Sequence, residues 1–303
     1  MKHIYLNLKR FDIPKCKGGV NSIADPREWG SYIVTNTQEK LKQFPGVEFA
    51  QFFPEAHLIS ACKAKTSDSP VLVGTQGLFW ADTAVGGPFG AFTTSLTGNA
   101  AVSFGCSYAL IGHCEERNKL AAILSEAGVV DPAAVNRILN KEILAAQKAG
   151  MKVLYCIGEK DTELSDWDKV LGDQLSIGLA GADLSKVAIA YEPVWSIGPG
   201  KTPADKPYIT KVARFVKEKT GGLDVVYGGG LKTDNAAMLA SIEEIDGGLI
   251  ALTQFTGDIG FYPDQYIEII KTLSRISRPC SSLPRISGAL SPMYILICFL
   301  TIA

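Results

Sequence analysis

The sequence predicts a single-domain protein of the α/β class, built as a closed (β/α)8 barrel. Short runs rich in apolar and β-branched residues recur along the chain, separated by longer segments with the apolar period of a helix. This alternation is typical of successive βα units around a parallel sheet. Eight such runs occur, and eight units suit a closed barrel better than an open sheet. The runs are residues 3–7, 47–53, 71–75, 108–112, 152–157, 187–192, 223–228 and 247–252.

Helices are expected between these strands, with the clearest signals at residues 131–149 and 207–219. Asp131 followed by Pro132 reads as an N-cap with proline at the first helical position, and Gly150 stands where the first of these helices ends. The βα rhythm continues to about residue 274 without a linker-like stretch. Residues 1–274 are therefore predicted to form one domain.

Residues 275–303 do not continue this rhythm. Their terminal apolar run, from Met293 to Ala303, is about half the roughly 20 residues that a membrane-spanning helix needs. We interpret the segment as a disordered or adventitious extension. The alternatives are a weak membrane tether and a partner-docking segment.

The composition excludes several classes of function. The chain has 303 residues, of which 47% are hydrophobic and 20% charged, and its formal net charge is −1. It therefore has no global positive field for nucleic acid or anionic lipid, and neither a nucleic acid nor a membrane is expected as partner. Seven cysteines without a C-x-x-C pair, and an N-terminus without an apolar export segment, indicate a reducing, cytoplasmic location.

Polar residues follow several of the predicted strands. Asn7 and Lys9 end the first strand, His113 and Glu115 follow the fourth, and Glu192 ends the sixth. In α/β barrels the active site is built at this end of the strands. The sequence therefore predicts that these side chains gather at one mouth of the barrel.

The sequence motifs around these residues resemble those of the triosephosphate isomerase family, and the resemblance covers nearly all of residues 1–274. Asn7-Leu8-Lys9 corresponds to its Asn-x-Lys, residues 112–116 to its Gly-His-Ser-Glu-Arg, and residues 156–159 to its Cys-Ile-Gly-Glu. Residues 190–201 carry its signature Ala-Tyr-Glu-Pro-Val-Trp-x-Ile-Gly-x-Gly-Lys. The loop from Gly90 to Thr93 is similar to the one that reaches across the family's dimer interface. The resemblance implies a TIM barrel, a homodimer and an aldose–ketose isomerase.

The same resemblance implies roles for individual residues. Glu192 would be the base that moves a proton between adjacent carbons, neutral His113 the electrophile, and Lys9 a stabiliser of negative charge, through an enediolate intermediate. Asn7 would contact the substrate. Two residues would support them: Glu115 orients the lysine, and Cys156 packs near the base.

The substrate's phosphate is expected to lie among backbone N–H groups. Gly198, in the lid formed by residues 193–201, and Gly229 and Gly230 after the seventh strand are the implied contacts. Ala251 and Leu252 replace a family Gly-Gly pair after the eighth strand, which could shift the phosphate toward Thr253.

Other departures concern residues near the mouth. Cys114 replaces a serine, Glu116 replaces an arginine with reversal of charge, and the loop over residues 14–26 is enlarged. His3 and His57 have no neighbours at metal-ligand spacing, so neither a metal nor a cofactor is expected.

The expected reaction interconverts glyceraldehyde 3-phosphate and dihydroxyacetone phosphate. Isomerisation of a four-carbon ketose phosphate such as erythrulose phosphate is the alternative within the same chemistry. A catalytically silent dimer that binds a phosphorylated ligand is the alternative from another class.

Overall fold

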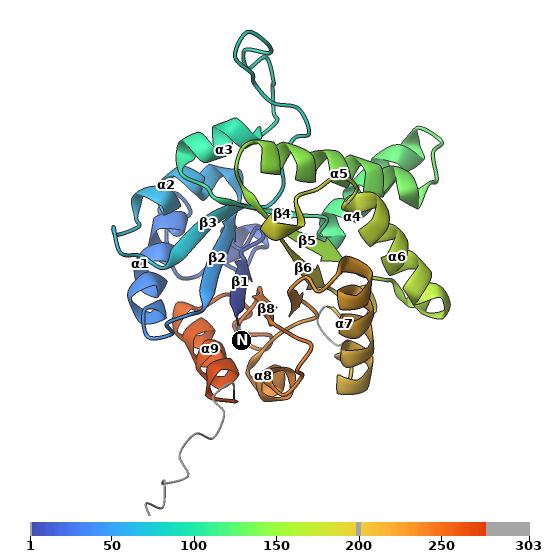
Figure 1. Ribbon diagram of the computed structural model, residues 1–303. Helices are drawn as coiled ribbons and strands as arrows, with labels where there is room; N and C mark the ends of the chain where they lie inside the picture. The colour runs from blue at the N-terminus through green and yellow to red at the C-terminus, as the bar shows by residue number, and fades with distance from the viewer. Residues whose placement is uncertain (1, 198–200, 277–303) are drawn as a thin grey trace, which may run out of the picture.

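The computed structural model describes residues 2–197 and 201–276. Within these ranges eight parallel strands pair in sequence order, and the last pairs back with the first to close a barrel. The helices surround this barrel (Figure 1). The predicted fold class is therefore confirmed.

The strands are β1 (His3–Asn7), β2 (Glu48–Phe53), β3 (Val71–Thr75), β4 (Tyr108–Ile111), β5 (Lys152–Ile157), β6 (Val187–Tyr191), β7 (Val225–Tyr227) and β8 (Gly247–Ile250). The described α-helices are α1 (Trp29–Leu41), α2 (Leu58–Lys63), α3 (Gly98–Phe104), α4 (Cys114–Glu126), α5 (Pro132–Lys148), α6 (Trp167–Gly178), α7 (Lys206–Thr220), α8 (Thr233–Ala240) and α9 (Pro263–Ile276). Short 3-10 turns span η1 (Lys15–Lys17), η2 (Glu55–His57), η3 (Asp161–Asp166), η4 (Leu184–Lys186) and η5 (Val194–Ser196).

The last two strands are shorter than predicted. Gly221 and Gly222 have φ angles of 71° and 102°, so the chain is still turning where the seventh strand was expected to begin. At the other end, β8 stops at Ile250, because the following residues leave the barrel to pair Gln254 with Gly260. Ala251 and Leu252 consequently lie in a loop and not in the strand.

Two apolar layers hold the barrel together. The larger layer lies between strands and helices, and a smaller one fills the barrel interior. Filling of this kind makes the barrel a packed core and not a pore. The buried interior residues are Tyr5, Ala50, Phe52, Tyr108, Leu110, Leu154, Cys156, Ala188, Ala190, Val226 and Leu249.

A polar network closes the end of the barrel where the strands begin. The Tyr5 hydroxyl donates to Glu48 over 3.0 Å, and the Tyr5 and Tyr108 hydroxyl oxygens are 2.8 Å apart. The His3 ring nitrogens lie 3.2 Å from Glu48 and 2.9 Å from Asp224. These contacts satisfy polar groups that would otherwise be buried without partners.

Helix α5 begins as the sequence predicts. The Asp131 carboxylate accepts a hydrogen bond from the Ala133 N–H over 2.9 Å, and Pro132 occupies the first helical position. The first N–H groups of a helix have no partner within the helix. The Asp131 carboxylate satisfies one of them, and Pro132 has no N–H to satisfy.

Helix α4 is unlike the other long helices, because none of its residues is buried. Its apolar side chains are partly or fully exposed, and 60% of the Ile123 surface is accessible. It begins at Cys114, three residues after the end of β4. Leu120 and Leu124 pack against the core while partly exposed, and polar contacts in the first turn, described below, also hold α4.

The segment between β3 and α3 projects away from the barrel (Figure 1). It contains the loop from Gly90 to Thr93. Two of its apolar residues, Val85 and Phe89, are almost completely exposed. An isolated chain leaves this apolar surface without a covering partner.

Helix α9 extends to Ile276, two residues past the predicted end of the domain at residue 274. The rest of the predicted extension, residues 277–303, lies outside the described residues. In the described ranges, each helix is too short or too polar to traverse a bilayer.

Candidate active site

The structure brings the predicted polar residues to one mouth of the barrel. Asn7 is the last residue of β1, His113 follows β4 by two residues, and Glu192 directly follows β6. All three are buried, with at most 7% of their surface exposed. The Glu192 Oε1 atom lies 3.3 Å from His113 Nε2, so residues 79 positions apart form a close pair.

The hydrogen bonds of His113 define its tautomer. The His113 ring caps α4, with Nδ1 accepting the N–H of Glu115 over 3.2 Å. An acceptor nitrogen carries no proton, so the proton of the neutral ring is on Nε2. The Nε2–H group faces Glu192 and is oriented as a donor at the mouth.

Two thiols flank the Glu192 carboxylate. The backbone N–H of Cys114 donates to Glu192 Oε2 over 3.3 Å. Burial and the charge of Glu192 raise the pKa of the Cys114 thiol to about 12, and the same two causes raise the pKa of Cys156. Both side chains therefore remain protonated near neutral pH, which agrees with a packing role and not with a nucleophile.

The backbone position of Glu192 is fixed by the neighbouring strand end. The Glu192 N–H donates to the Ile157 carbonyl over 2.8 Å. A Cβ atom on Gly158 would lie 1.9 Å from the Glu192 carbonyl oxygen. Only glycine fits here, because that distance is far shorter than any real contact.

The side chain of Gln76 holds Asn7 and the backbone of Lys9, and the sequence analysis missed it. Its Nε2 donates to the Asn7 Oδ1 and to the carbonyls of Lys9 and Phe52, over 3.1–3.2 Å. Lys9 has a φ of 41°, a left-handed conformation uncommon for residues other than glycine. The Asn7 Oδ1 supports it by accepting the Lys9 N–H. The position of Gln76, directly after β3, was the available signal.

Lys9 pairs with Glu115, as the resemblance implies. The Lys9 Nζ lies 2.7 Å from Glu115 Oε1. Desolvation would raise the pKa of Glu115, but the Lys9 ammonium outweighs it and the pKa is lowered. The carboxylate is therefore ionised and directs the ammonium toward α4.

Glu159 is a second residue that the sequence analysis quoted in a motif without a role. Its fully buried carboxylate accepts hydrogen bonds from the Tyr191 hydroxyl, the Trp195 indole and the Tyr208 hydroxyl, over 2.8–3.1 Å. Trp195 belongs to η5, the first turn of the predicted lid. Gly198, the predicted phosphate contact of this lid, lies outside the described residues.

The loops after β7 and β8 present backbone donors at the same mouth. Among described residues, the N–H groups of Gly229, Gly230 and Leu252 donate to no protein acceptor. Gly230 has a φ of 82°, which suits glycine. These donors are available to an anion.

The suggested shift of the phosphate toward Thr253 is not favoured by the contacts of that residue. The Thr253 N–H donates to the Gly260 carbonyl, and its hydroxyl oxygen accepts the Tyr262 N–H over 2.8 Å. Thr253 is also buried. Its polar groups are already used to shape the loop after β8.

One group of side chains in the described ranges has metal-ligand atoms close together, namely His113, Cys114 and Glu192, within 4.8 Å. A histidine ligand usually donates its other ring N–H to an acceptor. Here His113 Nδ1 accepts the N–H of Glu115. With a metal on Nε2, a proton on Nδ1 would point at that N–H donor, and without this proton Nδ1 could not donate to any acceptor. The arrangement suits a neutral donor ring better than a metal ligand.

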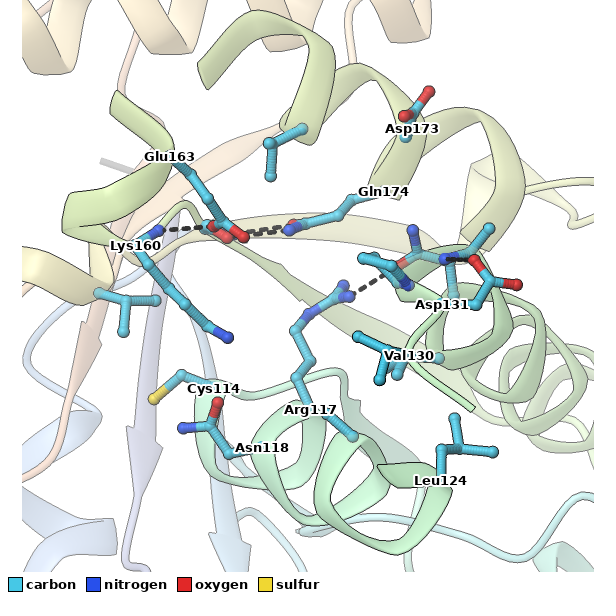
Figure 2. A pocket seen from close by; sticks show the side chains of 18 of the residues that line it. Cys114, Arg117, Asn118, Leu124, Val130, Asp131, Lys160, Glu163, Asp173 and Gln174 are labelled. Carbon is cyan, nitrogen blue, oxygen red and sulfur yellow. Dashed lines mark hydrogen bonds between the residues drawn. The ribbon is translucent and has the colours of Figure 1, made fainter. Parts of the chain in front are cut away.

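A cavity of about 330 Å3 lies beside the mouth, between α4, α5 and α6 (Figure 2). Its lining includes Cys114, Gly158 and Val194, but not Glu192, His113 or Lys9. Arg117 crosses its floor and donates to Asn136 Oδ1 over 2.7 Å. The candidate catalytic residues therefore do not belong to this cavity.

A closed (β/α)8 barrel with a carboxylate, an imidazole and an amine side chain at its mouth defines a barrel enzyme with groups suited to proton transfer next to a carbonyl. The sequence model of the triosephosphate isomerase family matches residues 27–271, which is most of the chain. The chain belongs to the triosephosphate isomerase family.

Individual relatives agree with this assignment. The chain is 33% identical over 218 residues to the triosephosphate isomerase of Geobacter metallireducens, covering 68% of this chain and 80% of the relative. It is 31% identical over 204 residues to that of Acaryochloris marina, covering 66% and 77%. The crystal structure of triosephosphate isomerase from Bartonella henselae matches with a TM-score of 0.65 at 21% identity, over 89% of this chain and 98% of that chain, which supports the fold.

Proposed function

We propose that this chain interconverts glyceraldehyde 3-phosphate and dihydroxyacetone phosphate, with Glu192 as base, His113 as electrophile and Lys9 as electrostatic stabiliser. Glu192 removes a proton from the carbon next to the carbonyl and returns it to the neighbouring carbon. This division of roles is the established chemistry of triosephosphate isomerases, and not a deduction from this chain alone.

The observation that carries the proposal is the pairing of Glu192 with the Nε2–H of His113. A substrate entering between them would meet a carboxylate and a neutral N–H donor together. Negative charge develops on the substrate oxygen in the enediolate, and preorganised donors stabilise such charge strongly where water is excluded. Lys9 and Asn7 supply an ammonium and an amide at the same mouth.

The phosphate is proposed to bind the backbone N–H groups of Gly198, Gly229, Gly230 and Leu252. Within residues 2–197 and 201–276, the N–H groups of Gly229, Gly230 and Leu252 have no protein acceptor, which supports the proposal. The Ala251 side chain and the bulk of Leu252 would then border the phosphate. Residues 193–201 would close over it and exclude water.

The chain is further proposed to act as a cytoplasmic homodimer through the loop from Gly90 to Thr93. The exposed Val85 and Phe89 on the same projecting segment support this, because a partner would cover them. Residues 1–274 would form the functional domain. Sedimentation of the purified chain at micromolar concentration would test the dimer.

The activity is tested on the purified full-length chain with three- and four-carbon sugar phosphates. Glu192→Asp shortens the base by one methylene, so kcat on the triose phosphates should fall by at least about 100-fold with little change in KM. Glu126→Asp, at the exposed C-terminal end of α4, is the matched control. Unchanged kcat in Glu192→Asp would show that the base is misassigned. Faster turnover of erythrulose phosphate would show a four-carbon substrate, and no turnover would indicate a silent relative.

A further inference from the structure

Glu116 stands where the family has an arginine, and it faces a second carboxyl group. Its side chain turns inward toward α5, where Glu142 is 95% buried, since 5% of its surface is exposed. The Glu116 and Glu142 side chains lie within hydrogen-bonding reach of each other. Two carboxylates cannot share a hydrogen bond without a proton, so one member of the pair is a carboxylic acid.

The surroundings of the pair show which member holds the proton. The backbone N–H of Gly112 donates to Glu116 Oε2 over 2.6 Å, and such a bond favours the ionised form. Glu142 Oε2 has no hydrogen-bond partner, which favours the neutral form. Glu142 is therefore the acid that donates, and Glu116 is the carboxylate that accepts.

The accepting group is directly connected to the electrophile. Gly112 precedes His113 and has a φ of 82°, and a Cβ atom there would lie 2.9 Å from the Cys156 carbonyl oxygen. Its N–H is held by Glu116, and its carbonyl accepts from Arg117 Nε over 2.8 Å. Two consecutive residues of α4 thus hold both backbone polar groups of Gly112, the residue that precedes His113.

We propose that Glu116 is a positioning residue for the isomerase, which fixes the Gly112–His113 turn only while Glu142 remains protonated and donates to it. The inference rests on the proposed role of His113 as electrophile.

The charged and titratable neighbours of the Glu116–Glu142 pair come from two elements, α4 and β5. On α4, Lys119 and Arg117 favour the charge of Glu116, and Lys119 acts in the same way on Glu142. On β5, the hydroxyl of Tyr155 and the thiol of Cys156 also face Glu116. Burial raises the pKa of both groups, and the charge of Glu116 contributes to this rise. Burial, followed by the charge of Glu116, raises the pKa of Glu142 to about 9. Above that pH the pair would hold two negative charges, and Glu116 would be driven from Gly112.

The test is the pH dependence of kcat for the full-length chain and the variant Glu142→Gln. The glutamine amide donates to Glu116 at every pH. We expect wild-type kcat to fall several-fold as pH rises through about 9, with little change in KM, and this step to be absent from Glu142→Gln. Superimposable profiles would overturn the proposal.

A second pair of variants separates positioning from folding. Glu116→Ala removes the acceptor of the Gly112 N–H, and kcat should fall at least tenfold at pH 7.5 with KM little changed. Glu116→Gln keeps an acceptor and should restore most of kcat. Glu126→Ala, at the exposed end of α4, is the matched control. Equal kcat in all of these variants would overturn the proposal, and failure of Glu116→Ala to fold would leave the glutamine variants to decide.

A measurement without substrate distinguishes this inference from the proposed function. In protein labelled with 15N-histidine, the His113 ring signals should change as pH rises through about 9 in the wild type and not in Glu142→Gln. An active enzyme with an unaffected His113 signal would overturn the positioning role alone. A responsive signal in an inactive chain would overturn the proposed function alone.

Discussion

Trp195 donates its indole N–H to the Glu159 carboxylate, with 2.8 Å between Nε1 and Oε1. The contact joins the first turn of the predicted lid to the loop after β5. Because the Glu159 carboxylate is buried, it depends on its three donors to remain solvated. Burial raises the pKa of Glu159, and the donors oppose this rise.

Replacing Trp195 by phenylalanine should therefore destabilise the protein. A hydrogen bond contributes about 0.5–1.5 kcal/mol, so the free energy of unfolding in urea should fall by about 1 kcal/mol. Trp80→Phe, at a half-exposed ring, is the control and should change it by less than about 0.5 kcal/mol. Similar losses in both variants would mean that the indole N–H is unimportant.

The Lys9–Glu115 pair should matter for catalysis more than for stability. The Glu115 side chain is largely exposed, and exposed ion pairs stabilise by only about 0–1 kcal/mol. Glu115→Gln should leave the melting temperature almost unchanged while kcat/KM falls about tenfold, since the ammonium loses its direction. Lys9→Met should reduce kcat/KM by at least about 100-fold.

Steady-state kinetics and thermal melts of the same preparations check both expectations. Lys42→Met, which removes another exposed ion pair far along the chain, serves as control. A Glu115→Gln variant that melts several degrees lower but turns over normally would reverse the assignment, making the pair structural.

The network at the opposite end of the barrel predicts how stability depends on acid. Burial would raise the pKa of Glu48, but His3 and Lys152 outweigh it and lower it to about 2. A lowered pKa stabilises the folded state above the unfolded value of about 4.3, and this contribution is lost as pH falls toward 2. Glu48→Gln should therefore cost most near pH 6, and its difference from wild type should shrink below pH 4.

The contribution of His3 to stability depends on pH with the opposite sign. Burial would lower its pKa, but Glu48 and Asp224 outweigh it and raise it above 6.5. Its stabilising contribution is complete below about 6.5 and is lost as pH rises through the raised value. The destabilisation caused by His3→Gln should thus be larger at pH 6 than at pH 9. Urea titrations across this range measure it, and a pH-independent difference would contradict the assigned shift.

A chain ending at Ile276 should keep the melting temperature, kcat and oligomeric state of the full chain. The expectation follows from α9, which extends to that residue and buries Leu273 against the core. Ending the chain at Leu273 instead removes the last residues of this helix. Loss of activity or of the dimer in the 1–276 chain would give residues 277–303 a functional role.

Much of the fold could be predicted because each strand and most helices carry their own signal. The strands at residues 3–7, 71–75 and 152–157 have the predicted bounds. The other strands are shorter by one to three residues, since their ends depend on neighbouring loops and not on apolar pattern. Only the helices at residues 131–149 and 207–219 were predicted individually. Helix α4 was not among them, and its contact with the core is limited to partly buried residues such as Leu120 and Leu124.

The candidate site divides in the same way. The positions of Glu192, His113 and Lys9 could be predicted from strand ends and motifs. The distances between them come from the structure, and their roles are a proposal. Gln76 and Glu159 act through hydrogen bonds that reach as far as 69 and 49 residues along the chain. Such partners have no sequence period, so only the three-dimensional structure reveals them.

Gly158 sets a condition on moving this chemistry to another protein. The base stands where it does because two backbones touch at the ends of β5 and β6, with no side chain between them. Grafting the glutamate alone onto a foreign barrel would transfer its carboxylate without that contact. A designer would need to carry both strand ends together, and any family member with a residue larger than glycine at this position should hold its base differently.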